Sequence, residues 1–441
     1  MLHELRFLYH TSGCIKAQWR GPATVPDVRG KRSVDAKRKN VRPGHLHHSR
    51  SAMAIPSFTS HLHRQLLVRL AFVPGETLPS YVDRLSALYG TTLHAMLCRL
   101  GLVTDGDLGR LAAYGVLLSE GARKTFAFVT GLSEEDTADL LLSRYAGSVV
   151  SSMQGPTANF GELIRKACVS EWAYFKGSHF CPDCLQESGG VWLNQWKLPW
   201  SVACVRHEIM LHDVCPGCGR RPRAGRRDGL YPAFYDRVPG PTRCNNAFGV
   251  RGVRKGRGSR PCGYSFVDLE GISATPNTLR AQRTIDQALH DARAPELLAN
   301  LTTTFFDDLR SICALILYAS EPEDLGSSEG LLDEAFSAHV QLRRAVVDER
   351  GPAANTRTRP RLGIFTDAPT SSALMAAVVQ RAMAILDQSE PLQRVESMRV
   401  LAARIYARRN RWKVLTDRRL PSGLRDVLEK SLVRLNSPLS V

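Results

Sequence analysis

The stretch "FCPDCLQESGGVWLNQWKLPWSVACVRHEIMLHDVCPGCG", residues 180–219, holds five of the eleven cysteines in the chain. Cys181-x2-Cys184 is followed after 19 residues by Cys204-x2-His207. This spacing is typical of structural zinc sites, because each short turn directs two ligands at one tetrahedral ion. The sequence therefore predicts a first zinc site made by these four residues.

A second site is predicted directly after the first. Cys215-x2-Cys218 makes another knuckle, in the glycine-containing sequence "CPGCGR". Its nearby partners are Cys244 and Cys262, with 17 residues between them. These four would form an all-cysteine site for a second Zn²⁺ ion. An interleaved arrangement, in which Cys181 and Cys184 share an ion with Cys215 and Cys218, has the same ligand count and stays open.

The pattern favours structural over catalytic metal. A zinc deaminase needs a His-x-Glu motif and a proline before its CxxC, whereas Glu208 follows His207 directly and Val214 replaces the proline. Catalytic zinc keeps three protein ligands and an open position, but each predicted set supplies four. A redox CxxC opens a helix, whereas "CPDCLQESGG" is expected to run into a polar turn. We therefore expect no catalytic residues and no enzymatic activity. His212, outside the knuckle, is a weaker ligand candidate than His207.

Two other residue groups have a structural interpretation. Four of the six tryptophans are Trp172, Trp192, Trp196 and Trp200. Because small zinc modules have thin cores, we expect these rings to pack on the knuckles rather than to stack on bases. The cysteines isolated in sequence are expected to behave as small apolar residues; they are Cys14, Cys98, Cys168 and Cys313.

The net charge of +17 is concentrated in two stretches. Residues 1–52 contain 11 Lys and Arg against 3 acids, and residues 219–261 contain 12 against 2. Clustered cations of this kind favour a polyanion partner, although a solvated loop is the alternative. The second stretch includes "RGVRKGRGSRPC", which we expect to contact DNA phosphates. Its candidate contacts are Arg251, Arg254, Lys255, Arg257 and Arg260.

Bulk composition predicts a folded chain. At 441 residues, 43% apolar and 23% charged, it has the length for two or three domains and a globular balance of residues. It has no run of 18 apolar residues and no secretory leader pattern, so we expect neither a membrane partner nor secretion. A reducing cytoplasm is then the expected compartment, in which CxxC pairs indicate metal sites before disulfides.

We predict a mainly α protein in four parts. Residues 1–55 form a disordered basic tail, and the cleaner sequence from Met53 suggests that the assigned start lies upstream of the real one. A helical domain with a helix-turn-helix-like hairpin follows at 56–170, a double zinc-binding module of zinc-ribbon or zinc-finger type at 171–270, and a helical domain at 271–441.

Local signals place several helices. Apolar residues recur at helical spacing from Pro79, with Gly90 and Gly101 as breaks. Ser133 and Asp136 predict a capping box, on a helix that should end near Gly147. After Pro276, at the first turn of another helix, the chain is expected to be helical to about residue 435, with loops at about 320–330 and 350–370.

The order of these features resembles the TniQ family of bacterial transposition proteins, which includes the TnsD-type target selectors. "VPGETLPSYVDRLSALYG", residues 73–90, is similar to the N-terminal signature of the family. The matching residues are Pro74, Glu76, Thr77, Ser80, Tyr81 and Arg84. The cysteine block is the more specific match, although the basic insertion between Cys244 and Cys262 departs from the compact pair usual in the family. The resemblance covers about residues 70–290.

The resemblance implies a non-catalytic adaptor that selects a transposition target site. Its expected partners are DNA, an AAA+ ATPase, the transposase complex and, where targeting is guided, an RNA-guided effector complex; a homodimer stays open. The alternative is a zinc-containing transcriptional regulator that binds DNA without a transposase. A metal hydrolase or deaminase is a third class, which the closed ligand sets disfavour.

Overall fold

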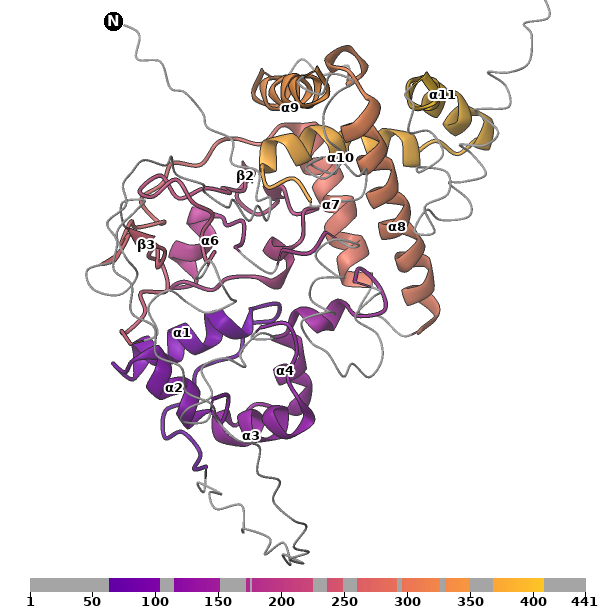
Figure 1. Ribbon diagram of the computed structural model, residues 1–441. Helices are drawn as coiled ribbons and strands as arrows, with labels where there is room; N and C mark the ends of the chain where they lie inside the picture. Colours follow the sequence, from indigo (N-terminus) through magenta and orange to yellow (C-terminus); the bar gives the residue numbers. More distant parts are fainter. Residues whose placement is uncertain are drawn as a thin grey trace, which may run out of the picture. The chain divides into compact units, whose positions relative to one another are not determined.

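The fold follows the helical signals of the sequence over most of the chain that can be described. The computed structural model describes residues 63–103, 115–150, 172–174, 177–224, 236–248, 260–291, 296–325, 330–348 and 368–407. Over these ranges the protein is mainly α, as the sequence predicts, with only two strand pairs of two residues each (Figure 1). The predicted tail at 1–55 lies outside the described residues.

The predicted helical pair is present near the start of the described chain. Helix α1 is Leu78–Leu88 and helix α2 is Leu93–Arg99. Thr77 and Thr92 cap them, each accepting a hydrogen bond from a backbone N–H three residues on, at 3.2 Å. Gly90, with φ of 58°, makes the turn between them.

Helix α3 is Glu120–Thr130 and helix α4 is Glu134–Asp139. The capping box of α4 is confirmed: Asp136 N donates to Ser133 Oγ at 2.9 Å, and Ser133 N donates to Asp136 Oδ2 at 3.3 Å. The predicted end near Gly147 is wrong, because α4 stops at Asp139 and a 3₁₀ turn, η2, follows at Leu142–Tyr145. The next three residues, Leu140 to Leu142, are all buried, and three consecutive residues cannot lie on one face of an α-helix.

Within the described residues, five helices follow the cysteine region. Their bounds are α7 Pro276–Asp291, α8 Glu296–Ala319, α9 Gly330–Asp348, α10 Ser372–Leu386 and α11 Pro391–Ala407. Pro276 begins α7 as predicted, and a 3₁₀ turn, η5, at Pro322–Asp324 occupies the first predicted loop. Most of the second predicted loop, and the chain beyond Ala407, lie outside the described residues.

Helix α10 is the centre of this helical group. It contacts α7, α8, α9 and α11, and ten of its fifteen residues are buried. A helix that is apolar around its circumference is stable only when it is covered on all sides, which is the position α10 occupies (Figure 1).

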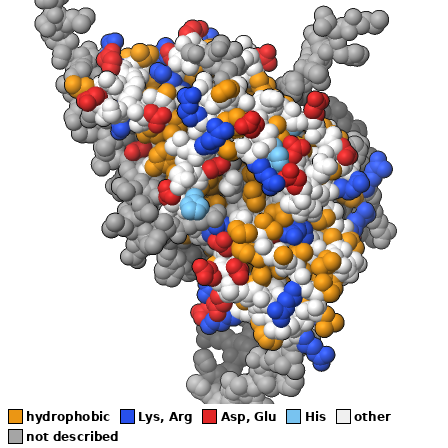
Figure 2. All heavy atoms as spheres, turned by 180° about the vertical axis from the view of Figure 1, so that it is seen from behind, with side chains coloured by type: hydrophobic (Ala, Val, Ile, Leu, Met, Phe, Trp, Pro, Cys, Tyr) orange, Lys and Arg blue, Asp and Glu red, His pale blue; other side chains and the backbone are white. Residues whose placement is uncertain are grey.

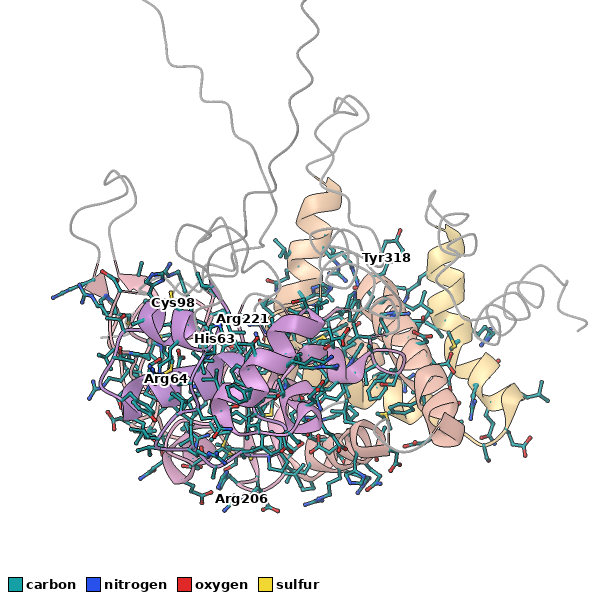
Figure 3. The ribbon with its side chains drawn as sticks, turned by 90° about the horizontal axis from the view of Figure 1, so that it is seen from below. His63, Arg64, Cys98, Arg206, Arg221 and Tyr318 are labelled. Carbon is teal, nitrogen blue, oxygen red and sulfur yellow. The ribbon has the colours of Figure 1, made fainter. Side chains whose placement is uncertain are left out.

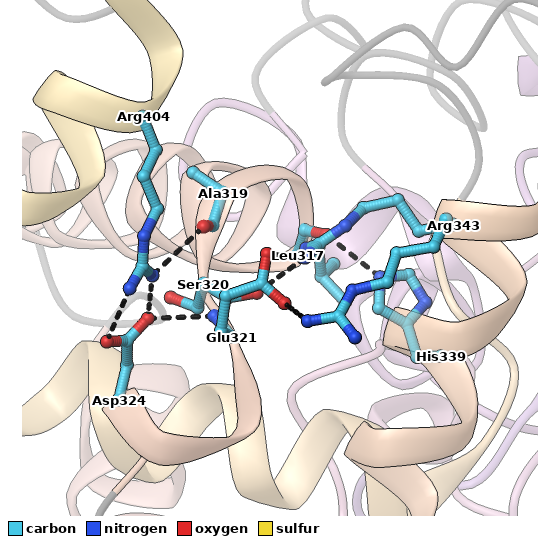
Figure 4. Close-up of polar contacts among 9 residues, drawn as sticks. Leu317, Ala319, Ser320, Glu321, Asp324, His339, Arg343 and Arg404 are labelled. Atoms are coloured by element: carbon cyan, nitrogen blue, oxygen red, sulfur yellow. Dashed lines mark hydrogen bonds and ion pairs between the residues drawn. The ribbon is translucent and has the colours of Figure 1, made fainter. Parts of the chain in front are cut away.

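A polar network closes the C-terminal end of α8 (Figure 4). The last carbonyls of a helix have no partner within it. Here Arg343 of α9 donates to the carbonyl oxygens of Leu317 and Ser320 at 2.9 and 2.8 Å and to Glu321 Oε1 at 2.9 Å. Arg404 of α11 donates to Ala319 O at 3.3 Å and pairs with Asp324. The network thus links α8 to α9 and α11.

The hydrophobic core of these helices also receives residues from before them. The rings of Trp172 and Trp200 stack with centroids 5.8 Å apart, and Trp200 lies 6.3 Å from Phe306 of α8. Gln282 Oε1 of α7 accepts hydrogen bonds from the backbone of residues 202 and 203 at 2.8 and 3.2 Å. One hydrophobic core therefore contains residues from before and after residue 270, the predicted boundary between the zinc module and the C-terminal domain. The domain boundaries stay a prediction.

The surface near the first helices carries exposed apolar side chains. Leu67 is 97% exposed and Phe128 of α3 is 54% exposed. A shallow hollow of about 410 Å³ lies between the segment before α1 and α3, lined by Arg69, Lys124 and Phe128 among others. Figure 2 shows hydrophobic side chains gathered over the lower part of one face, interspersed with charges. None of the described helices is long and apolar enough to cross a membrane.

Candidate metal centre

The first ligand cluster forms around two tight turns. Helix α6, Pro182–Glu187, begins directly after Cys181, whose Sγ accepts a hydrogen bond from Cys184 N at 3.4 Å. The short antiparallel pair of β1, Ala203–Cys204, and β2, Ile209–Met210, carries the second turn, which contains His207. Two local structures thus each present two ligands.

The four ligand atoms of this cluster face one another. His207 Nδ1 lies 3.2 Å from Cys181 Sγ, 3.3 Å from Cys184 Sγ and 3.4 Å from Cys204 Sγ. Cys184 Sγ and Cys204 Sγ are 3.6 Å apart. A tetrahedral Zn²⁺ with Zn–S bonds of about 2.3 Å would hold its sulfur ligands about 3.8 Å apart. The spacing therefore suits one small tetrahedral ion.

The second cluster has the same form. Cys215, Cys218, Cys244 and Cys262 place their sulfur atoms within 4.8 Å of one another. Cys215 and Cys262 are 3.8 Å apart, as are Cys218 and Cys244. The structure thus brings the cysteines together in the sequential arrangement, and the interleaved alternative does not occur. These two are the groups in the described chain whose ligand atoms could hold a metal ion.

In each cluster the pKa of one thiol is lowered and the pKa of a neighbouring thiol is raised. Hydrogen bonds from Cys181 and Cys184 lower the pKa of Cys204 to about 2, whereas hydrogen bonds with Cys181 and Cys204 raise the pKa of Cys184 far above its usual value. In the second cluster Cys244 lowers the pKa of Cys218 to about 4, while the pKa of Cys244 is strongly raised. One thiolate forms readily and its neighbours resist ionisation, because like charges this close repel. A bound cation would stabilise the full thiolate set.

Aromatic rings form the wall around the clusters. Phe180, Trp192, Trp196 and Phe266 share a hydrophobic cluster with the ligand cysteines, and Phe180 and Phe266 lie 4.6 Å apart. The expected packing on the knuckles thus holds for two of the four tryptophans. Trp172 and Trp200 belong instead to the helical core. All four rings are buried, so they offer no surface for stacking on bases.

Several sequence expectations about the rival chemistries can be compared with the geometry. The stretch "CPDCLQESGG" reaches the expected turn at residues 188–190, but a six-residue helix, α6, which was not expected, comes before it. His212 stacks on Phe180 at 5.3 Å and is not in either cluster. Glu208 is 65% exposed and its Oε1 lies 3.5 Å from Arg283 of α7, so this carboxylate is not held against the ligands. Cys313 is a buried core residue, as expected.

Four of the predicted DNA contacts, Arg251, Arg254, Lys255 and Arg257, lie outside the described residues, and the fifth, Arg260, is exposed. Strand β3 at Ala247–Phe248 pairs antiparallel with β4 at Arg260–Pro261. This pairing brings residues 247–248 next to residues 260–261, close in sequence to the ligands Cys244 and Cys262.

Helix α1 is attached to the metal region by a buried ion pair. Arg84 Nη1 lies 2.7 Å from Glu76 Oε2, and Glu76 is fully buried. Ser80 Oγ donates to Glu76 Oε1 at 2.7 Å and accepts from Trp192 N at 2.9 Å. Thr77 N donates to Trp192 O at 2.8 Å. Trp192 lies between the two halves of the first cluster in sequence, so these contacts hold α1 against the first cluster. We call the contacts among Glu76, Thr77, Ser80, Arg84 and Trp192 the clamp.

The clamp has further contacts on each side. Asn194 Nδ2 donates to Glu76 O at 2.9 Å. Arg223, just after the second knuckle, donates to Asp83 Oδ2 at 2.8 Å and lies 4.7 Å from the centroid of Trp192. Burial raises the pKa of both acids, opposed by Arg84 at Glu76 and by Arg223 at Asp83. The two arginines therefore oppose the effect of burial and favour the ionised form of these acids.

The segment before α10 is attached from the other direction. Ser372 N donates to Asp213 Oδ2 at 2.8 Å, and the two ring nitrogens of His179 lie 2.8 Å from Ser201 O and 3.2 Å from Thr370 O. Burial and the charge of Arg221 lower the pKa of His179 to about 3, so the ring is neutral. The metal region is thus bonded to helices that precede and follow it in sequence.

These features define a class of protein: a mainly α chain with two closed cysteine-rich clusters, one of them clamped to an N-terminal helical pair. Residues 67–211 match the family model of TniQ. The resemblance found in the sequence is confirmed there. No curated protein matches the chain. The match includes the first ligand cluster and the clamp, and ends before the second cluster.

Sequence reasoning missed three contributors to this site, Asp83, Glu187 and Arg223. Glu187 Oε1 lies 3.2 Å from His207 Nε2. Isolated acids and arginines carry no periodicity, so their pairing appears only when the fold brings them together. For Glu187 the one available signal was its position three residues after Cys184.

Loss of the clamp charge is expected to destabilise the protein. Replacing Glu76→Gln leaves Arg84, only 13% exposed, without a partner, and removing one member of a buried pair costs about 3 to 5 kcal/mol. The free energy of unfolding in urea measures the change. In the control Glu120→Gln, the pair with Lys124 is exposed on α3, and no measurable loss is expected. Equal stability of the two variants would contradict a structural role for the clamp.

Proposed function

We propose that this protein is a non-catalytic adaptor in DNA transposition, which selects the target site and recruits an AAA+ ATPase and the transposase. The observation that carries the proposal is the TniQ match over residues 67–211. A transposition-associated role follows from the match; target selection and recruitment are the proposed part. The geometry is compatible with an adaptor, because the contacts of the cysteine clusters with α1 and α10 fix the relative positions of these elements.

The ligand sets support a non-catalytic role. Each cluster contains four protein ligands, which fill a tetrahedral ion and leave no position for water or substrate. A deaminase also needs a carboxylate at the metal to move protons. Glu208, the acid next to His207, is instead paired with Arg283 on the exposed side.

We propose that both clusters bind Zn²⁺. Three cysteines with one histidine, and four cysteines, are both donor combinations of structural zinc sites, and thiolate ligands favour zinc over magnesium or calcium. When bound, the metal supplies cross-links between short turns whose own hydrophobic contacts are few. The ligand residues position these turns, and the surrounding rings exclude water.

Metal analysis tests the two sites separately. The purified wild-type chain is expected to contain two zinc ions. Cys204→Ser and Cys244→Ser each remove one ligand from a different cluster, so each variant should retain one ion. Mass spectrometry of the metal against protein concentration gives the ratio. A wild-type chain with fewer than two ions would contradict the closed-site proposal and reopen the catalytic alternative.

The charge of the second basic stretch supports contact with DNA. Residues 219–261 carry 12 basic against 2 acidic residues. Strands β3 and β4, which come directly before and after residues 249–259, pair with each other, and the ligands Cys244 and Cys262 lie a few residues from them in sequence. Phosphate contacts made from such a stretch would add affinity without sequence information.

The salt dependence of DNA binding tests this interaction. Replacing Arg251, Arg254, Lys255, Arg257 and Arg260 by Ala should weaken binding and lower the slope of log affinity against log salt, by about 0.9 for each phosphate that is no longer neutralised. The measurement is fluorescence anisotropy with duplex DNA between low and physiological salt. As a control, Arg344→Ala and Arg399→Ala alter exposed arginines on α9 and α11 and should leave the slope unchanged. An unchanged slope in the five-residue variant would refute the interaction.

Recruitment is tested in the native host. Deletion of the gene should abolish targeted insertion, and affinity capture of the full chain should recover an AAA+ ATPase and a transposase. Recovery of an RNA-guided complex as well would indicate guided rather than direct DNA recognition. If the chain binds DNA, captures neither protein and changes transcript levels, the transcriptional regulator is the correct interpretation instead.

A further inference from the structure

His207 in the first cluster has two ring nitrogens with different surroundings. Nδ1 faces three cysteine sulfur atoms at 3.2 to 3.4 Å. Nε2 is buried and makes no hydrogen bond of good geometry to any described residue. The carboxylate Oε1 of Glu187 nevertheless lies 3.2 Å from it. The ring is thus placed between a set of sulfur ligands and a carboxylate.

A neutral imidazole can bind a metal through only one nitrogen, and the other then carries the proton. If Nδ1 is the ligand atom, the proton must be on Nε2. A buried N–H without an acceptor is costly, and an outer carboxylate removes this cost while fixing the tautomer and orientation of the ring. Glu187 is at the correct distance to be that acceptor.

The local structure explains why Glu187 is in this position. It is the last residue of α6, the helix that begins directly after Cys181 and contains Cys184. Residues three apart on a helix lie on nearly the same face, so Cys184 and Glu187 both point toward the second turn. Helix α6 therefore carries one sulfur ligand, Cys184, and the carboxylate that faces the nitrogen ligand, and its N-cap residue Cys181 is a second sulfur ligand.

The second oxygen of Glu187 is also held. Glu187 Oε2 lies 2.9 Å from Arg206 Nη2, and Arg206 directly precedes His207. Arg206 is 71% exposed and lies at the edge of the molecule in Figure 3. The attraction between Arg206 and Glu187 is therefore screened by solvent. The Nε2 atom of His207, which faces the other oxygen of Glu187, is buried.

We propose that Glu187 is a positioning residue of the first metal centre, which accepts the Nε2 proton of His207 in a hydrogen bond and thereby presents Nδ1 to the metal. The inference rests on the zinc occupancy proposed above. Glu187 does not bind the metal itself. Its loss should weaken one of the two sites and leave the other unchanged.

The test is competition for Zn²⁺ between the full-length chain and a chromophoric chelator. In Glu187→Ala, one of the two ions should bind about 10 to 100 times more weakly, the range found when outer carboxylates are removed. Glu187→Gln keeps an acceptor oxygen and should lose less. Glu208→Gln is the matched control, because Glu208 adjoins His207 in sequence but pairs with Arg283. It should bind both ions as the wild type does.

A spectroscopic measurement separates positioning from general stability. Nitrogen-15 NMR of the zinc-loaded wild type should show a protonated Nε2 and a metal-bound Nδ1 at His207, and Glu187→Ala should change the Nε2 signal. Equal affinity in Glu187→Ala and Glu208→Gln would overturn the inference, as would equal weakening of both ions. If the wild type itself binds fewer than two ions, the proposed zinc occupancy fails instead.

Discussion

The ion pair between Glu76 and Arg84 is the interaction on which the arrangement of the TniQ domain depends. A buried carboxylate is stable as an ion only when it is paired and hydrogen-bonded, and Glu76 receives both Arg84 and Ser80. The same Ser80 oxygen accepts from the backbone of Trp192, so one hydroxyl group links the buried carboxylate to the metal region. The signature residues Glu76 and Ser80 are thus buried, and they contribute to the packing of α1 against the metal region.

The metal clusters and the helices depend on each other. The strands beside the ligands are only two residues long, and such pairs are not stable alone. Metal ligation would fix the turns from within, while Asp83 to Arg223, Ser372 to Asp213 and the Gln282 side chain attach them to helices outside. These attachments come from α1, before the cysteine region, and from α7 and α10, after it. The cysteine clusters therefore connect the N-terminal helices with the C-terminal helices. This is a suitable position for a protein whose proposed task is to connect partners.

Much of the candidate site was predictable because metal ligands obey short-range spacing. The first set of four followed from two turns of fixed geometry, and α1, α2 and the capping box of α4 from local patterns. Other features depended on packing. Helix α4 ends early because three consecutive leucines are all buried, and Trp172 and Trp200 joined the helical core although their sequence neighbours Trp192 and Trp196 packed on the ligands.

The sequence by itself determined the ligand types, their pairing within each turn and the mainly helical class, because these depend on residues a few positions apart. Only the tertiary structure decided which turns form one ligand cluster, since two arrangements of the cysteines satisfy the same ligand count. It also decided the partners of the charged residues. The sequence does not indicate which group each of Glu76, Asp83 and Glu187 contacts, and in the fold each contacts a different one. Such pairings span from a few to more than a hundred residues, and only the folded chain brings their members within hydrogen-bond distance.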